Sequence, residues 1–232
     1  FFDTAVIMRF QISHTIFFVK RILFKIKSRR IDMRRKNFYG RAFLSFLKKN
    51  KTFFVCSGAN LERDGLLDSL QGFLLFNDTH PGYTFEIASS INQNDQYHKK
   101  CLDLINLHPN LFKLLGPLPP YLIPEKMVES SALLLTPHQN YQTKGFPTKL
   151  GEYLASGTPT ICSMIDDLIG VINANIVYSV KPNSPQMIAE ALHSILMNPK
   201  EAESISSAAQ RFMKENYTID SYKKALISFL KI

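Results

Sequence analysis

One segment of fifteen residues, 145–159, constrains the fold of this chain more than any other stretch. Pro147 suits the first position of a helix, where its missing N–H costs nothing. Gly157 suits the position just after the last turn, which often has a left-handed backbone. Leu150 and Leu154 are one helical turn apart, so they would form an apolar face that packs on a sheet. The segment therefore predicts a loop, a helix and the entry to a strand.

The same helix predicts a binding site at its amino-terminal end. Glu152 falls about 200° around the helix from Leu150, nearly in line with Thr148 one turn earlier. The segment 145–149 would offer free backbone N–H groups and the positive end of the helix dipole, which suits a phosphate. A carboxylate one turn further on suits sugar hydroxyls.

The run Gly-Phe-Pro-Thr-Lys-Leu-Gly-Glu-Tyr-Leu-Ala-Ser-Gly-Thr-Pro resembles the donor-binding signature of GT-B glycosyltransferases, in particular the retaining family 4 enzymes that use nucleotide sugars. The resemblance covers about residues 51–232. It implies that Glu152 holds the ribose hydroxyls of the nucleotide and that the preceding loop approaches the diphosphate and the sugar. The donor-binding residues implied in that loop are Gly145, Phe146, Pro147, Thr148 and Lys149.

Residues 51–65 read as a strand, a turn and the start of a second helix. The unit resembles the first one of the GT-B donor domain, in which a glycine lets the backbone approach the nucleotide and an Arg and a Lys contact the diphosphate. Gly58 matches that glycine. The usual Arg and Lys fall on Ala59 and Asp64, which leaves Arg63 as the cation expected to help bind phosphate.

A further departure lies eight positions before Glu152, where retaining members commonly carry a second glutamate and this chain has Lys144. Lys144 and His138, in the loop before the signature, are the candidate catalytic residues. The alternatives are a solvated loop charge for Lys144 and an ordinary core or surface histidine for His138. The resemblance implies no bound metal and no cofactor, because helix ends and cations neutralise the leaving diphosphate.

Continuous apolar runs alternate with helical segments along the rest of the chain. Strands are expected at 51–57, 83–88, 112–115, 132–136, 160–162 and 175–180, and helices at 65–76, 101–107, 125–130, 186–197, 201–216 and 221–231. This order predicts an α/β fold with a Rossmann-like parallel sheet covered by helices on both faces. Ligands of such sheets lie beyond the carboxyl ends of the strands.

The net charge of +9 comes from one part of the chain. Residues 1–50 hold 13 Lys and Arg against 2 Asp, whereas the other 182 residues hold 15 basic and 17 acidic side chains. Two readings of this basic, partly helical segment stay open: a helix lying on anionic lipid, or the remnant of an acceptor domain that precedes the donor domain at 51–232. A nucleic-acid arm is weighted lower, because no aromatic stacking platform is recognisable.

Three widely spaced cysteines suggest neither a disulfide framework nor a zinc site, and no apolar run is long enough for a spanning helix. The expected location is the cytosol, or the inner face of a membrane. The function expected from the resemblance is transfer of a sugar from a nucleotide diphosphate sugar to a carbohydrate or lipid-linked acceptor, in surface polysaccharide or cell-envelope synthesis. The alternatives are a partner-dependent nucleotide-sugar-binding subunit, a GT-B-fold sugar epimerase, and an interaction protein driven by residues 1–50.

Overall fold

A computed structural model describes residues 51–58, 60–139, 146–218 and 221 of the 232-residue chain. Its strands are β1 (Thr52–Cys56), β2 (Thr84–Ala88), β3 (Phe112–Leu114), β4 (Ala132–Leu135), β5 (Thr160–Ser163) and β6 (Tyr178–Val180). Its helices are α3 (Leu66–Thr79), α4 (Gln96–Leu107), α5 (Ile123–Glu129), α6 (Thr148–Ser156), α7 (Pro185–Met197) and α8 (Pro199–Asn216).

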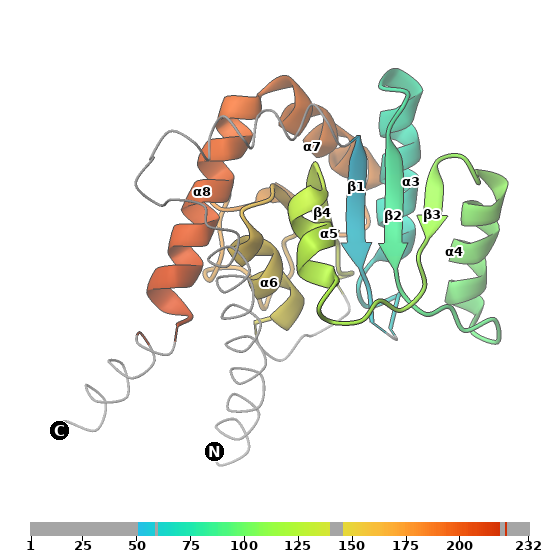
Figure 1. The fold of residues 1–232 in the computed structure, drawn as a ribbon, viewed down its shortest axis with the longest axis horizontal. Coiled ribbons are helices and arrows are strands. Elements are labelled where there is room, and N and C mark those ends of the chain that lie inside the picture. The colour runs from blue at the N-terminus through green and yellow to red at the C-terminus, as the bar shows by residue number, and fades with distance from the viewer. Residues whose placement is uncertain (1–50, 59, 140–145, 219–220, 222–232) are drawn as a thin grey trace, which may run out of the picture.

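The six strands form one parallel sheet in the order β3-β2-β1-β4-β5-β6. The chain builds outward from β1 in one direction and then returns to build from β4 in the other. In sheets of this kind the crevice for a ligand opens between the two central strands, at their carboxyl ends. The arrows of β1 and β2 in Figure 1 point to that edge. The predicted α/β, Rossmann-like fold is confirmed.

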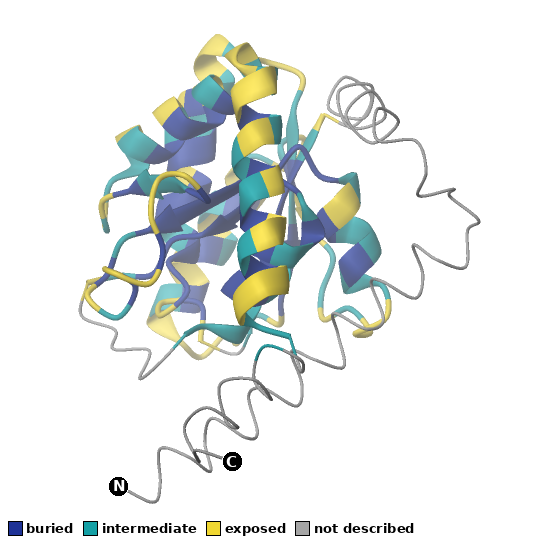
Figure 2. Ribbon diagram, turned by 90° about the vertical axis from the view of Figure 1, so that its left-hand side faces the viewer, coloured by how far each residue is buried: buried dark blue, intermediate teal, exposed yellow. Residues whose placement is uncertain are grey.

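Each face of the sheet carries its own apolar core, because successive side chains of a strand point to opposite faces. Phe53 and Val55 of β1 pack with α3, α4 and α7, whereas Phe54 between them packs with α5, α6 and α8. Figure 2 shows the buried residues concentrated between the helices and the sheet. Helices therefore cover both faces, which explains why the strands read as continuous apolar runs.

Helix α4 and strand β6 begin at other residues than the sequence predicted. Helix α4 begins at Gln96, not near Cys101, because the side chain of Asp95 accepts the N–H of His98 at 2.9 Å and caps the helix. Strand β6 begins at Tyr178, not at Asn175. The carbonyl of Asn173 accepts the N–H groups of residues 176 and 177, so this part of the predicted strand is a turn.

The predicted position of Pro147 is wrong by one residue. Pro147 precedes the helix as its cap, with φ −64° and ψ 125°, and Thr148 is the first helical residue. The fixed φ of proline suits both positions, but the extended ψ excludes Pro147 from the helix. Gly157 ends the helix in the left-handed conformation, as predicted.

The basic segment 1–50 and the terminal helix expected at 221–231, apart from residue 221, lie outside the described residues. Within the described part of the chain, no helix combines the length and apolar character that crossing a membrane requires.

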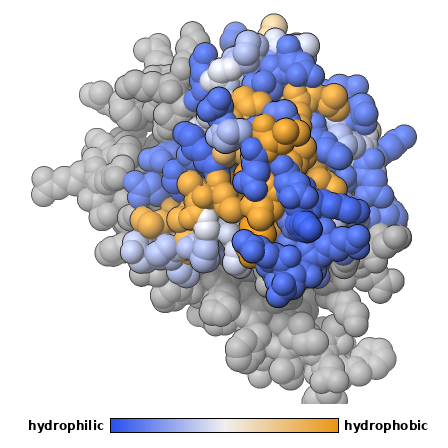
Figure 3. Space-filling model, turned by 90° about the vertical axis from the view of Figure 1, so that its right-hand side faces the viewer, coloured by the Kyte–Doolittle hydropathy of each residue, from blue (hydrophilic) through white to orange (hydrophobic). Residues whose placement is uncertain are grey.

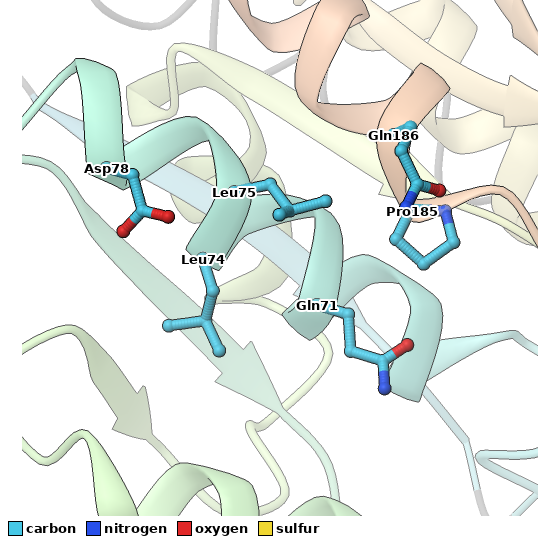
Figure 4. Close-up of a pocket in the computed structure, with 6 residues that line it drawn as sticks. All are labelled: Gln71, Leu74, Leu75, Asp78, Pro185 and Gln186. Atoms are coloured by element: carbon cyan, nitrogen blue, oxygen red, sulfur yellow. The ribbon is translucent and has the colours of Figure 1, made fainter.

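A hollow of about 290 Å³ lies between α3 and α7 and contains none of the predicted site residues. Figure 4 shows its lining: Gln71, Leu74, Leu75 and Asp78 from α3, with Pro185 and Gln186 from the start of α7. A separate apolar area is visible in Figure 3 on the face at the β3 edge of the sheet. Leu107 at the end of α4 and Leu114 in β3, the strand at this edge, are exposed.

Candidate functional site

The loops after β1 and β4 are locked together at the centre of the sheet. Gly65, the residue before α3, has φ +69°, and a β-carbon on it would lie 1.6 Å from the carbonyl oxygen of Thr136. The hydroxyl of Thr136 donates to the carbonyl of Gly65 at 2.9 Å and lies 2.8 Å from the hydroxyl of Ser69. Only glycine allows this approach, so the β1–α3 turn and the end of β4 form one rigid base for the site.

Helix α6 is fixed to the same place by its buried face. Leu150, Tyr153 and Leu154 are fully buried, which confirms the predicted packing face. The hydroxyl of Tyr153 accepts the N–H of Cys56, at the end of β1, at 2.8 Å. The apolar spacing of Leu150 and Leu154 does not predict this bond, which ties the middle of α6 to the carboxyl end of β1.

The amino-terminal end of α6 therefore opens near the carboxyl ends of β1 and β4. The N–H of Gly151 donates to the carbonyl of Pro147 at 3.2 Å, so the N–H groups of 148–150 precede the hydrogen-bonded turns of the helix. Such groups are the donors that bind anions at helix ends. Thr148 and Lys149 are half-buried at this end.

Glu152 lies one turn into α6 and is half-buried. Burial raises its pKa to about 7, although the ammonium of Lys149 acts in the opposite direction. The predicted position of Glu152, away from the packed face formed by Leu150, agrees with this intermediate exposure. A carboxylate in this environment can accept hydrogen bonds from hydroxyl groups of a ligand when it is ionised.

Lys149 reaches from α6 to the β1–α3 turn. Its ammonium lies over Gly58, 3.7 Å from where a β-carbon on that glycine would stand. It forms an ion pair with Asp64, whose side chain is 6% exposed. Lys149 and Gly58, predicted from different segments of the chain, are therefore brought together.

Arg63 also contacts Asp64, with 3.1 Å between its Nε and the Oδ1 of the carboxylate. Its side chain is 45% exposed and lies at the rim of the turn. The sequence did not predict that Asp64 pairs with both cations; the resemblance indicates only that Asp64 stands where the family usually has a lysine. The adjacency of Arg63 and Asp64 in the sequence could have indicated one of these pairs, whereas Lys149 lies 85 positions away.

Phe146 leads into α6 and packs against the end of α8. Its ring stacks on Tyr217, with centroids 4.7 Å apart, and Tyr217 also contacts Phe212 at 5.6 Å. Phe146 is therefore packed against the end of α8 by a contact between residues 71 positions apart, which no local pattern predicts.

His138 follows β4 and faces the first turn of α3. Its Nε2 lies 3.1 Å from the Oδ2 of Asp68, and its ring meets the edge of Tyr97 at 6.2 Å. Burial raises the pKa of Asp68, although His138 opposes this effect. The other candidate catalytic residue, Lys144, and Gly145 lie outside the described residues. Among the residues that are described, no three His, Cys, Asp or Glu side chains are grouped to hold a metal ion.

Solved structures with the same fold include several glycosyltransferases. The carboxyl-terminal domain of the glycosyl transferase group 1 family protein LpcC from Francisella tularensis has 18% identity and a TM-score of 0.63, over 73% of this chain and 88% of that one. Anabaena Alr3699/HepE, solved with UDP, has 16% identity and a TM-score of 0.67, over 82% of this chain and 51% of that one. The chain thus spans about half the length of HepE.

Sucrose-phosphate synthase from Thermosynechococcus elongatus has 15% identity and a TM-score of 0.63, over 83% of this chain and 47% of that one. At these identities the likeness concerns the fold. A sequence comparison with curated proteins gave no match. The family profile described as glycosyl transferases group 1 matches residues 43–212, which include the sheet, the β1–α3 turn and the α6 signature. The chain belongs to the group 1 glycosyltransferase family.

Proposed function

We propose that this chain binds a nucleoside diphosphate sugar at the carboxyl ends of β1 and β4 and takes part in transferring the sugar to an acceptor. The observation that carries the proposal is the half-buried carboxylate of Glu152, one turn behind the open end of α6 and close to the charge of Lys149. Membership of the group 1 family supports it. So does the fold shared with HepE, which has been solved with UDP and with UDP-glucose.

Each side chain has a separate part in the proposed chemistry. Glu152 accepts hydrogen bonds from the ribose hydroxyls, which orients the nucleotide. The N–H groups at the start of α6, its dipole and the ammonium of Lys149 stabilise the negative charge that develops on the leaving diphosphate. Gly58 lets the backbone of the turn approach the nucleotide, and Arg63 lies at the rim as a further cation.

The finer part of the proposal concerns the outcome of the transfer. Resemblance to the family 4 enzymes supports a retaining transfer, with a carbohydrate or lipid-linked acceptor in surface polysaccharide or cell-envelope synthesis. Product analysis by NMR would distinguish a retained from an inverted anomeric bond. An inverted product would contradict the retaining assignment and leave the donor site unaffected.

Calorimetric titration of the full chain with UDP, GDP and their sugars tests donor binding. We expect one of these nucleotides to bind and Glu152→Gln to weaken it about tenfold, since a hydrogen bond to a charged group contributes about 1.5–3 kcal/mol. Glu190→Gln, which removes an exposed carboxylate from α7, is the matched control and should leave the affinity unchanged. A folded protein that binds none of them, or equal binding by Glu152→Gln, would contradict the proposal.

A further inference from the structure

The buried carboxylate of Asp64 accepts hydrogen bonds from several polar groups of the β1–α3 turn and from α6. Its Oδ2 accepts the hydroxyl of Ser57 at 2.8 Å, the N–H of Gly58 at 3.3 Å and the ammonium of Lys149. Its Oδ1 accepts the Nε–H of Arg63. The carboxylate thus has partners from the turn itself and from α6.

These partners are the kinds of group that bind phosphate. A hydroxyl, a backbone N–H after a strand and an ammonium are typical ligands of phosphate oxygens in turns between a strand and a helix. They converge near Gly58, where the absence of a side chain leaves room for the ammonium of Lys149. In this chain the carboxylate of Asp64 already binds the hydroxyl of Ser57, the N–H of Gly58 and the ammonium of Lys149.

The carboxylate is charged at neutral pH. Burial by itself would raise the pKa of Asp64, but the charge and hydrogen bond of Lys149 outweigh it, with help from Ser57 and Arg63, and the pKa is lowered. A diphosphate that binds at the start of α6 must therefore share Lys149 with a negative group, and the two anions repel each other.

We propose that Asp64 is an internal competitor of the donor diphosphate, which occupies the Lys149 ammonium and the Ser57 and Gly58 donors and thereby lowers the affinity of the site for the nucleotide. The inference rests on the proposed donor site. It assigns to Asp64 a role opposite to that of the lysine that the family has at this position.

The test compares the affinity of the wild-type chain and of Asp64→Asn for UDP and GDP, and for uridine and guanosine, by NMR titration. Asn has nearly the same shape and removes the charge. We expect Asp64→Asn to bind the nucleoside diphosphate about tenfold more tightly, as one charged hydrogen bond becomes available to it. The affinity for the nucleoside, which lacks phosphate, should stay the same.

Two further variants identify the origin of the gain. In the background of Lys149→Met, the gain from Asp64→Asn should fall below about twofold, because the released ammonium is absent, and the double-mutant cycle measures this coupling. Glu62→Gln removes an exposed carboxylate from the same turn. It is the control for long-range charge and should change the affinity less than about twofold, because salt screens exposed charges.

The outcomes separate the two proposals. If the wild-type chain binds no nucleotide, or binds it without dependence on Glu152, the proposed donor site is contradicted. The proposed role of Asp64 is then contradicted as well. If binding depends on Glu152 but Asp64→Asn binds the diphosphate equally or more weakly, the competitor role alone is overturned.

The inference can also be tested without a substitution at Asp64, should that variant not fold. In the wild-type chain, adding the nucleoside diphosphate that binds should move the ¹³C resonance of the Asp64 carboxylate, because Lys149 is drawn away from it. The matching nucleoside should leave that resonance in place. A resonance unchanged by the bound diphosphate would overturn the proposal.

Discussion

Glu152 and Asp64 show how two carboxylates in one site acquire opposite properties. Asp64 has cations and hydrogen-bond donors around it, so its pKa is lowered in spite of burial. Burial is the dominant effect on the pKa of Glu152 and raises it to about 7. Asp64 is therefore ionised throughout the neutral pH range, whereas Glu152 changes its charge within that range.

Nucleotide binding should therefore depend on pH through Glu152. Below pH 7 its carboxyl becomes protonated and loses part of its capacity to accept the ribose hydroxyls. We expect the affinity for UDP or GDP to rise severalfold between pH 6 and pH 8, and to be nearly flat over this range in Glu152→Gln. Calorimetric titrations at three pH values measure the effect, and equal pH profiles for the two proteins would contradict it.

At the scale of elements, the proposed donor site depends on a close contact between two loops. Gly65 lies against the carbonyl of Thr136, so the β1–α3 turn cannot move away from the end of β4 without breaking the Thr136 bonds. Tyr153 adds α6 to the same assembly through Cys56. The loop, strand end and helix are therefore held in one arrangement before any ligand binds.

The substitution Gly65→Ala should destabilise the protein by about 3 kcal/mol or more, because a left-handed φ is unfavourable for alanine and its β-carbon would overlap Thr136. The matched control is Gly116→Ala, since Gly116 has φ +68° and nothing within 4 Å of an added β-carbon. Gly116→Ala should lower the free energy of unfolding by only about 1–2 kcal/mol. Urea unfolding measures both free energies, and equal losses would show that the contact with Thr136 is unimportant.

The sequence predicted the elements better than their contacts. Apolar runs such as Phe53 to Val55 predicted buried strands, and Gly157 predicted the end of α6, because these signals are local. The start of α4 was missed since its cap, Asp95, lies in a polar stretch that reads as a loop. The pairing of Lys149 with Asp64 joins residues 85 positions apart, which only the folded sheet brings together.

At the scale of the whole molecule, the charged groups of the site should shape how stability depends on pH. Asp64 has a folded pKa below its unfolded value, so it stabilises the protein above about pH 4 and this contribution is lost on acidification. Glu152 has a raised folded pKa, so it destabilises the protein as the pH rises from about 4.5 to about 7. The two effects occur in different pH ranges.

Thermal and urea unfolding of Glu152→Gln at several pH values tests this separation. Relative to the wild-type chain, the variant should gain stability between pH 4 and pH 8, on the order of 2 kcal/mol at the upper end after allowance for partial exposure. Glu190→Gln should show no such trend. A gain for Glu152→Gln that is independent of pH would mean that the carboxylate is not destabilised by burial.

The stack of Phe146 on Tyr217 gives the end of α8 an influence on the segment that leads into α6. A chain cut before residue 217 would keep every strand of the sheet and the whole of α6, yet Phe146 would lose the aromatic ring on which it stacks. Trimming from the carboxyl terminus would thus alter the surroundings of the proposed nucleotide site long before it reached the sheet.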